Sequence, residues 1–104
     1  MSVLVEFAIF PTDKGESKSP YVARVLDMID KSGLPYMFTP MGTIVEGETV
    51  SEVLGVVEKA YDELQLDCER IYSVIKIDYR KGPTGRLRKK ISSVEEKVGR
   101  KLNA

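Results

Sequence analysis

The chain contains no histidine, no tryptophan and a single cysteine, Cys68. Without histidine there is no Ser-His-Asp triad, no Cys-His pair and no imidazole ligand for a metal. One cysteine forms no internal disulfide and cannot build a zinc site alone. Most catalytic templates are excluded, and we expect no catalytic residue, no metal and no cofactor.

Long apolar runs are also missing, and side-chain amides are scarce. No run approaches the roughly 20 apolar residues of a membrane helix. The opening stretch MSVLVEFAIF has no basic flank and no small-residue cleavage site, so we expect a cytoplasmic protein without a secretory signal or membrane contact. One Asn and one Gln beside abundant Lys and Glu resemble the composition of proteins from hot environments.

The 104 residues leave room for one domain, residues 1–104, in which charge is unevenly distributed. Residues 1–79 carry 7 basic and 14 acidic side chains, a net charge of −7, whereas residues 80–104 carry 9 and 2, a net charge of +7. This asymmetry indicates either a nucleic-acid-binding segment or contacts with acidic surface inside an oligomer. The basic stretch lacks aromatic side chains for base stacking, which favours subunit contacts.

Hydrophobic periodicity predicts four strands. Apolar residues alternate over residues 2–10, and β-like runs follow at 36–39, 43–46 and 69–80. Pro40-Met-Gly42 separates the two short runs, which predicts a hairpin turn or a bulged bend. Gly82-Pro-Thr-Gly85 lacks the spacing of a phosphate-binding loop and is predicted to be a turn.

Three helices are predicted between and after these strands. The first has Ser19 as N-cap, Pro20 at its first position and Gly33 as a left-handed cap. The second opens on the capping-box spacing of Thr49-Val-Ser-Glu52. The third is capped at Ser92 or Ser93, and its apolar stripe consists of Ile91, Val94, Val98 and Leu102.

The order of these elements predicts an α+β fold of the ferredoxin-like βαββαβ type. Right-handed crossovers give an antiparallel sheet ordered 4-1-3-2 with two helices on one face. Residues 1–80 form this core, and residues 81–104 add a basic loop and a C-terminal helix. The uncovered face is too apolar to remain wet, so we expect self-association to a dimer or tetramer. Its apolar members are Leu4, Phe10, Tyr72 and Val74.

Several charged and hydroxyl groups allow two interpretations. Glu6 and Lys76 form a cross-strand ion pair or frame a ligand site on the open face, and Asp78 can join either arrangement. Glu46 and Glu48 stabilise the start of the second helix or supply carboxylates to a ligand. Of the hydroxyls before the first helix, Ser19 is a cap, whereas that of Ser17 is free to bind.

Three motifs resemble one family: Glu6-Phe-Ala-Ile-Phe-Pro11, Ser17-x-Ser19-x-Tyr21-Val-Ala23 and Thr39-Pro-Met-Gly-Thr43-x-x-Glu-Gly47. The stretches Ile75-Lys-Ile-Asp78-x-Arg80 and Ser93-Val-Glu-Glu-Lys-Val-Gly99 extend the likeness over nearly the whole chain. The chain is similar to the small thiamine-binding proteins related to the YkoF type, an uncharacterised family of about this length.

This resemblance implies a ferredoxin-like homo-oligomer, commonly a tetramer, that binds thiamine or its hydroxymethylpyrimidine moiety without catalysis. Tyr36 or Phe38 with Met41 can supply the walls of an aromatic slot. The candidate ligand-binding residues are Glu6, Ser17, Ser19, Thr39, Met41, Gly42, Thr43, Glu46 and Asp78.

The alternative function is a regulatory or structural oligomeric module whose basic C-terminal segment contacts nucleic acid. An enzyme that uses only carboxylate, lysine or tyrosine chemistry ranks third, because no constellation of residues supports it.

Overall fold

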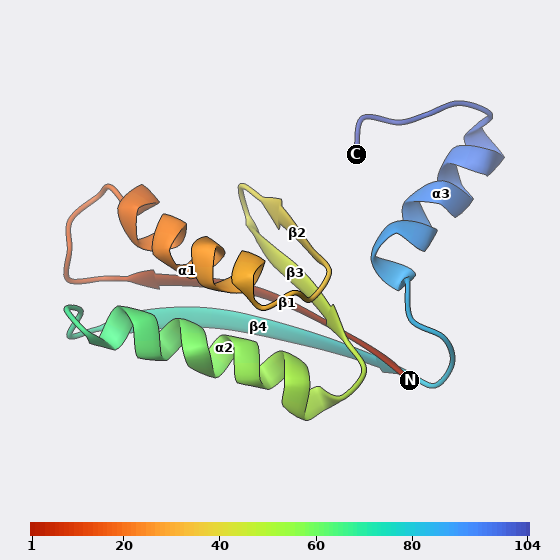
Figure 1. Ribbon diagram of the computed structural model, residues 1–104. Helices are drawn as coiled ribbons and strands as arrows, with labels where there is room; N and C mark the ends of the chain where they lie inside the picture. The colour runs from red at the N-terminus through yellow and green to blue at the C-terminus, as the bar shows by residue number, and fades with distance from the viewer.

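The computed structural model describes residues 1–104 and contains four strands and three helices (Figure 1). The elements, in chain order, are β1 (Ser2–Pro11), α1 (Ser19–Lys31), β2 (Tyr36–Thr39), β3 (Gly42–Gly47), α2 (Val50–Gln65), β4 (Ile71–Arg80) and α3 (Arg86–Val98).

The four strands form one antiparallel sheet in the order β2-β3-β1-β4. Read from the β4 edge, the order is 4-1-3-2, which has the same neighbours as the predicted sheet. The alternation of β1 decides which face is covered: its odd-numbered apolar residues are buried beneath α1 and α2, and Leu4, Glu6, Ala8 and Phe10 face the other side. The buried set is Val3, Val5, Phe7 and Ile9.

The helix boundaries follow local capping at α2 but not at α1. Thr49 caps α2 by accepting a 3.0 Å hydrogen bond from the N–H of Glu52, as predicted. In α1 the N-cap is Lys18, and Ser19 is already helical and caps nothing, so that prediction was wrong. Gly33, with φ of +79°, follows the last turn of α1 in the left-handed conformation, as predicted.

The start of α3 was predicted seven or eight residues too late, at a cap on Ser92 or Ser93. The helix begins at Arg86, with Gly85 as N-cap at φ of +96°, and Ser92 lies inside it, with its hydroxyl donating to the Arg88 carbonyl at 3.3 Å. The predicted cap failed because the capping group is not local. It is the carboxylate of Glu46, which reaches the first N–H groups of α3 from β3. Leu102 lies beyond the end of the helix at Val98.

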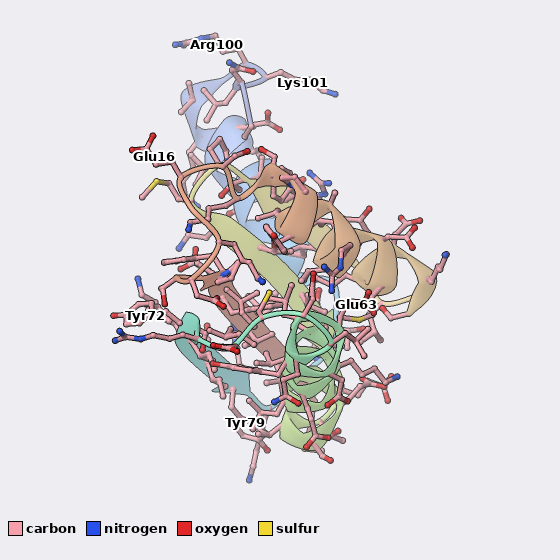
Figure 2. All side chains as sticks on the ribbon, turned by 90° about the vertical axis from the view of Figure 1, so that its left-hand side faces the viewer. Glu16, Glu63, Tyr72, Tyr79, Arg100 and Lys101 are labelled. Carbon is pink, nitrogen blue, oxygen red and sulfur yellow. The ribbon has the colours of Figure 1, made fainter.

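The two-helix layer leaves β4 incompletely covered. Ile75 and Ile77 pair with Phe7 and Val5 and so lie on the helix side of the sheet, yet they are 41% and 44% exposed. Tyr72, on the open face, and Tyr79, on the helix face, both project outward from β4 (Figure 2). The 10-residue edge strand therefore exposes apolar side chains on both of its faces.

The molecule is extended for its mass, because α3 projects away from the sheet beyond its first turn (Figure 1). Its accessible surface is 7038 Å², whereas a monomer of this mass typically exposes about 5,900 Å². The Cα radius of gyration is 15.1 Å, against about 13 Å for a typical domain of this length. No helix combines the length and the hydropathy needed to span a bilayer.

Candidate functional site

A groove lies between α1, the β2–β3 hairpin and the last third of β1. It encloses about 910 Å³, within the range of about 300–1,000 Å³ that is usual for small-molecule sites. Its lining is mostly apolar and includes no aspartate or glutamate. The lining residues are Phe7, Ala8, Ile9, Phe10, Lys18, Ser19, Val22, Ala23, Val25, Leu26, Tyr36, Phe38, Thr39, Pro40, Met41, Gly42 and Thr43.

Unequal strand lengths create this groove. β3 pairs with β1 only from Val3 to Phe7, whereas β4 pairs with β1 as far as Pro11. The β2–β3 hairpin turns back at Pro40 and Met41, as predicted, so the β3 side of residues 8–11 is left without a neighbouring strand. A short hairpin beside a long strand therefore leaves a notch, and α1 forms its second wall.

Thr43 contributes a hydroxyl group to the lining of the groove. The residue pairs with Phe7 and is only 5% exposed, yet its hydroxyl takes part in none of the hydrogen bonds within the chain. No fully shielded side-chain oxygen or nitrogen of the chain lacks a hydrogen-bond partner, so the Thr43 oxygen keeps contact with solvent. A hydroxyl without an internal partner on a groove-lining residue is available to a ligand atom.

Two of the other predicted groove residues, Thr39 and Gly42, stabilise the hairpin itself. The hydroxyl of Thr39 donates to the Gly42 carbonyl at 2.9 Å and accepts from the Met41 N–H at 3.2 Å, which closes the hairpin turn. A Cβ at Gly42 would lie 3.2 Å from the Phe7 carbonyl oxygen, so this glycine permits close approach of the hairpin to β1. Of the three, Met41 alone is free, with 88% of its surface exposed at the turn.

Aromatic side chains from β2 form part of the groove wall. Phe38 is 54% exposed and lines the groove together with Met41. Tyr36 is fixed by its hydroxyl, which donates to Asp30 Oδ1 in α1 at 2.8 Å. That hydrogen bond, together with burial and the Asp30 charge, raises the pKa of Tyr36 above its ordinary value. The Tyr36 side chain is therefore uncharged at neutral pH and is held in place as part of the groove wall.

The N-terminus of α1 closes one end of the groove. Lys18 and Ser19 line it there, and Ser17 lies in the exposed loop just before them. The Lys18 ammonium donates to the Gly15 carbonyl. The first turn of α1 holds no acidic residue and no side chain caps it. This end of the groove is therefore electropositive.

The three predicted carboxylates lie outside the groove. Glu6 forms the expected cross-strand ion pair with Lys76 on the open face, with 3.7 Å between Oε1 and Nζ. Asp78 pairs with Arg86 at 2.8 Å instead of facing a ligand. Neither carboxylate is among the groove-lining residues, which leaves Ser19, Thr39, Met41, Gly42 and Thr43 together at the groove.

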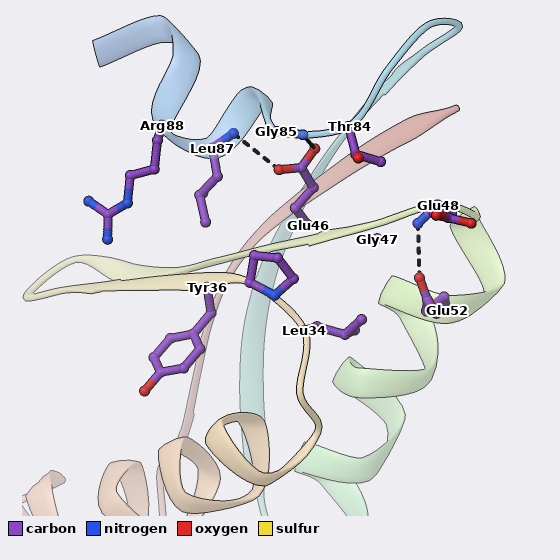
Figure 3. Close-up of a pocket in the computed structure, with 11 residues that line it drawn as sticks. Leu34, Tyr36, Glu46, Gly47, Glu48, Glu52, Thr84, Gly85, Leu87 and Arg88 are labelled. Carbon is purple, nitrogen blue, oxygen red and sulfur yellow. Dashed lines mark hydrogen bonds between the residues drawn. The ribbon is translucent and has the colours of Figure 1, made fainter. Parts of the chain in front are cut away.

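Glu46 is 3% exposed and belongs to a second, more polar cavity of about 810 Å³ between the starts of α2 and α3 (Figure 3). Its Oε2 accepts from the Ser2 hydroxyl at 2.7 Å and from the N–H groups of Gly85 and Arg86 at 2.8 and 3.2 Å. Oε1 accepts from the Leu87 N–H at 3.2 Å. Both oxygens are thus engaged within the chain.

These contacts explain the electrostatics of Glu46. Burial acts to raise the pKa of the carboxyl, but the hydrogen bonds from Ser2 and from the first amides of α3 outweigh it, and the pKa falls below its ordinary value. From the sequence, Glu46 was expected either to stabilise the start of the second helix or to supply a carboxylate to a ligand. The structure places it at α3, and α2 is served by Glu52, whose Oε1 accepts from the Glu48 N–H at 2.9 Å.

Sequence reasoning missed part of the groove. Lys18 was not singled out, because a lone lysine in a polar loop carries no signal. Val22 and Leu26 of α1 also line the groove, and the sequence alone gives no sign of this, because a helical apolar stripe that contacts the core and one that forms a groove wall have the same spacing. No group of three or more His, Cys, Asp or Glu side chains is placed to hold a metal ion.

The chain has a ferredoxin-like α+β fold with a largely apolar groove, of a size usual for small-molecule sites, beside the β2–β3 hairpin. A family model described as "Thiamine-binding protein" matches residues 5–95. The chain belongs to this family.

Its relatives include UPF0045 proteins from bacteria and archaea. One from Mycobacterium bovis is 37% identical over 95 residues, covering 91% of this chain and 93% of the relative. One from Methanothermobacter thermautotrophicus is 33% identical over 98 residues, covering 92% and 99%. The family predicted from the motifs is thereby confirmed.

Solved structures share the fold. A hypothetical protein from Methanocaldococcus jannaschii superposes with a TM-score of 0.80 at 32% identity, covering 91% of this chain and 97% of that one. A Thermotoga maritima protein, for which a role in thiamine biosynthesis or salvage has been proposed, gives a TM-score of 0.77 at 24% identity, covering 90% and 99%. The comparisons offer no support for the nucleic-acid alternative.

Proposed function

We propose that this protein binds thiamine or its hydroxymethylpyrimidine moiety, without catalysis, in the groove between α1 and the β2–β3 hairpin. Membership of the thiamine-binding family supports the ligand class. The observation that supports the choice of groove is its largely apolar lining, to which Thr43 contributes a hydroxyl that has no hydrogen-bond partner within the chain.

The chemistry of the lining suits an aminopyrimidine. Its ring would lie against Phe7 and Ile9 and be flanked at the mouth by Phe38 and Met41. One edge of such a ring carries hydrogen-bond donors and acceptors, and Thr43 can serve either, since a hydroxyl both donates and accepts. Apolar walls with few, fixed polar groups are the usual design of a small-molecule site.

The groove favours binding over catalysis. Its polar side chains are hydroxyls and one ammonium, with no carboxylate to act as general base and no activated nucleophile beside it. A protein with this lining orients a ligand and shields it from water. Binding of this kind would be sufficient for delivery, storage or sensing of the ligand.

We further propose that the protein acts as a homo-oligomer in the cytoplasm. The exposed apolar residues on both faces of β4 and the large accessible surface support association between copies. Acidic residues 1–79 and basic residues 80–104 are complementary between two copies of one chain.

Calorimetric titration with thiamine, hydroxymethylpyrimidine and thiamine diphosphate tests the ligand assignment. We expect saturable heat with thiamine or the pyrimidine, and amide shifts upon binding that cluster at residues 38–43. Absence of heat with all three compounds at millimolar concentration would overturn the proposal.

A further inference from the structure

The aromatic wall of the groove is joined to a carboxylate that does not itself line the groove. Tyr36 and Phe38 lie two residues apart on β2, so both side chains are on the same face of the sheet and both line the groove. Tyr36 points from β2 towards α1 (Figure 3), and its hydroxyl donates to Asp30 Oδ1 at 2.8 Å. A carboxylate is thus held at the outer edge of one aromatic ring of the wall.

No ion pair neutralises Asp30. Lys31, the basic residue in the last turn of α1, pairs with Asp27 at 2.8 Å, and Asp30 takes part in none of the ion pairs of the chain. The carbonyl end of α1 adds partial negative charge at the same place. Asp30 follows the groove-lining Leu26 by about one helical turn, so this negative charge lies at the end of α1 opposite to Lys18.

The hydrogen bond from Tyr36 transmits this charge to the aromatic ring. A phenol that donates to a carboxylate becomes more electron-rich, because the charge of the acceptor polarises the O–H bond and the ring attached to it. The face of such a ring attracts a cation more strongly than the face of an isolated phenol. Asp30 also raises the pKa of Tyr36 through this hydrogen bond, so the hydroxyl stays protonated and remains the donor.

The position of Tyr36 relative to Thr43 suits a ligand of two joined rings. Phe38 pairs directly with Thr43, and Tyr36 is the diagonal neighbour of Thr43, about 7 Å away. A pyrimidine that bonds to the Thr43 hydroxyl would bring a second ring, attached through one methylene, against Tyr36. In thiamine this second ring is the permanently cationic thiazolium.

We infer that Tyr36, held by Asp30, is the cation-recognising wall of the groove and makes the protein prefer thiamine to a neutral ligand of the same shape. The inference rests on the proposed function and assigns the part of the site that recognises the charge of the ligand. Tyr36 contacts the thiazolium, whereas Asp30 acts through Tyr36 as a positioning residue.

The test compares thiamine with an isostere in which a neutral thiophene replaces the thiazolium. The two compounds share one shape, so the ratio of their affinities, measured by calorimetry, reports the effect of the charge. We expect thiamine to bind about 5-fold more tightly than the isostere, as a cation over an aromatic face implies. Added salt should lower this ratio, because Asp30 is exposed and its charge is screened.

Matched variants locate the origin of the preference. Asp30→Asn removes the charge but keeps an acceptor for the Tyr36 hydroxyl, so the ratio should fall about 2-fold or more while the isostere binds as before. Asp62→Asn makes the same change of net charge at an exposed position on α2, outside the groove, and should leave the ratio unaltered. Tyr36→Phe keeps the ring but breaks its link to Asp30, so adding Asp30→Asn to it should cause no further fall.

The outcomes distinguish this inference from the proposed function. If thiamine and its isostere bind equally, or if Asp30→Asn lowers the ratio no more than Asp62→Asn does, the inference is wrong while the ligand class stands. If Asp30→Asn lowers the ratio equally with and without the Tyr36 hydroxyl, Asp30 does not act through Tyr36, and the inference is again wrong. If thiamine, its isostere and hydroxymethylpyrimidine all fail to bind, the proposed function is wrong as well.

Discussion

Glu46 Oε2 accepts a 2.8 Å hydrogen bond from the N–H of Gly85, 39 residues further along the chain. This contact makes a β-strand carboxylate the cap of a C-terminal helix. It also explains why the third helix begins where no local capping residue stands, since helix N-terminal amides can be satisfied by any acceptor that reaches them.

Replacing Glu46 with Gln should destabilise the protein. The amide keeps one acceptor oxygen but points N–H groups at the donors of α3 and Ser2, so about 1–3 kcal/mol of unfolding free energy should be lost. Chemical denaturation measures the change. Glu6→Gln is the matched control, because its ion pair with Lys76 is exposed and should contribute less than about 1 kcal/mol. Full stability of Glu46→Gln with lost ligand affinity would instead assign Glu46 to the ligand.

The capping contact should weaken in acid. The pKa of Glu46 is lower in the folded protein than its ordinary value, so its stabilisation is complete above about pH 4.3, the unfolded value, and is lost as pH falls through the lower folded value. Amide resonances of Arg86 and Leu87 report this titration by NMR and separate it from Asp13 and Asp67, whose pKa values are also lowered. A midpoint at or above the ordinary value would contradict the assignment.

Thr43→Val should reduce ligand affinity without lowering stability. The substitution keeps the shape of the side chain and removes a hydroxyl that has no partner within the chain, so loss of one hydrogen bond to the ligand predicts about a 10-fold weaker affinity. Calorimetry and thermal melting measure the two effects. Thr12→Val, in the exposed loop outside the groove, should change neither. Unaltered affinity in Thr43→Val would exclude the part of the groove beside Thr43 as the binding position.

Light scattering at micromolar concentration should give the mass of a dimer or tetramer. Val74→Glu places a charge on the open face beside the Phe10–Tyr72 pair, whose ring centroids are 5.7 Å apart, and should lower that mass. Leu54→Glu makes the same change at a half-exposed apolar position on α2 and should leave it unaltered. A monomeric parent protein would refute self-association.

Local patterns predicted the strands, the hairpin and the α2 cap, because each depends on neighbouring residues. The alternation over β1 separates buried Val5 from exposed Glu6, and Thr49 with Glu52 marks the start of α2. Neighbour relations in the sheet also followed, since right-handed crossovers restrict the topology.

The site was less predictable because it depends on distant pairs. A carboxylate in a motif looks the same whether it meets a ligand or the amides of a helix 40 residues away, as Glu46 does. Likewise, nothing in the sequence around Asp78 indicates its ion pair with Arg86. Thr39 and Thr43 share one motif, yet the turn uses the first hydroxyl and leaves the second open. Only the three-dimensional arrangement separates these roles.

The capping cluster around Glu46 also constrains the order in which the chain folds. Arg86 donates to the Ser2 hydroxyl at 2.9 Å and to the Ser2 carbonyl at 3.0 Å across 84 residues, and the Ser2 hydroxyl donates to Glu46 across 44. Closing such long loops is entropically costly before the sheet exists. The first turn of α3 should therefore form after the transition state for folding, so that substitutions there accelerate unfolding and leave the folding rate unchanged.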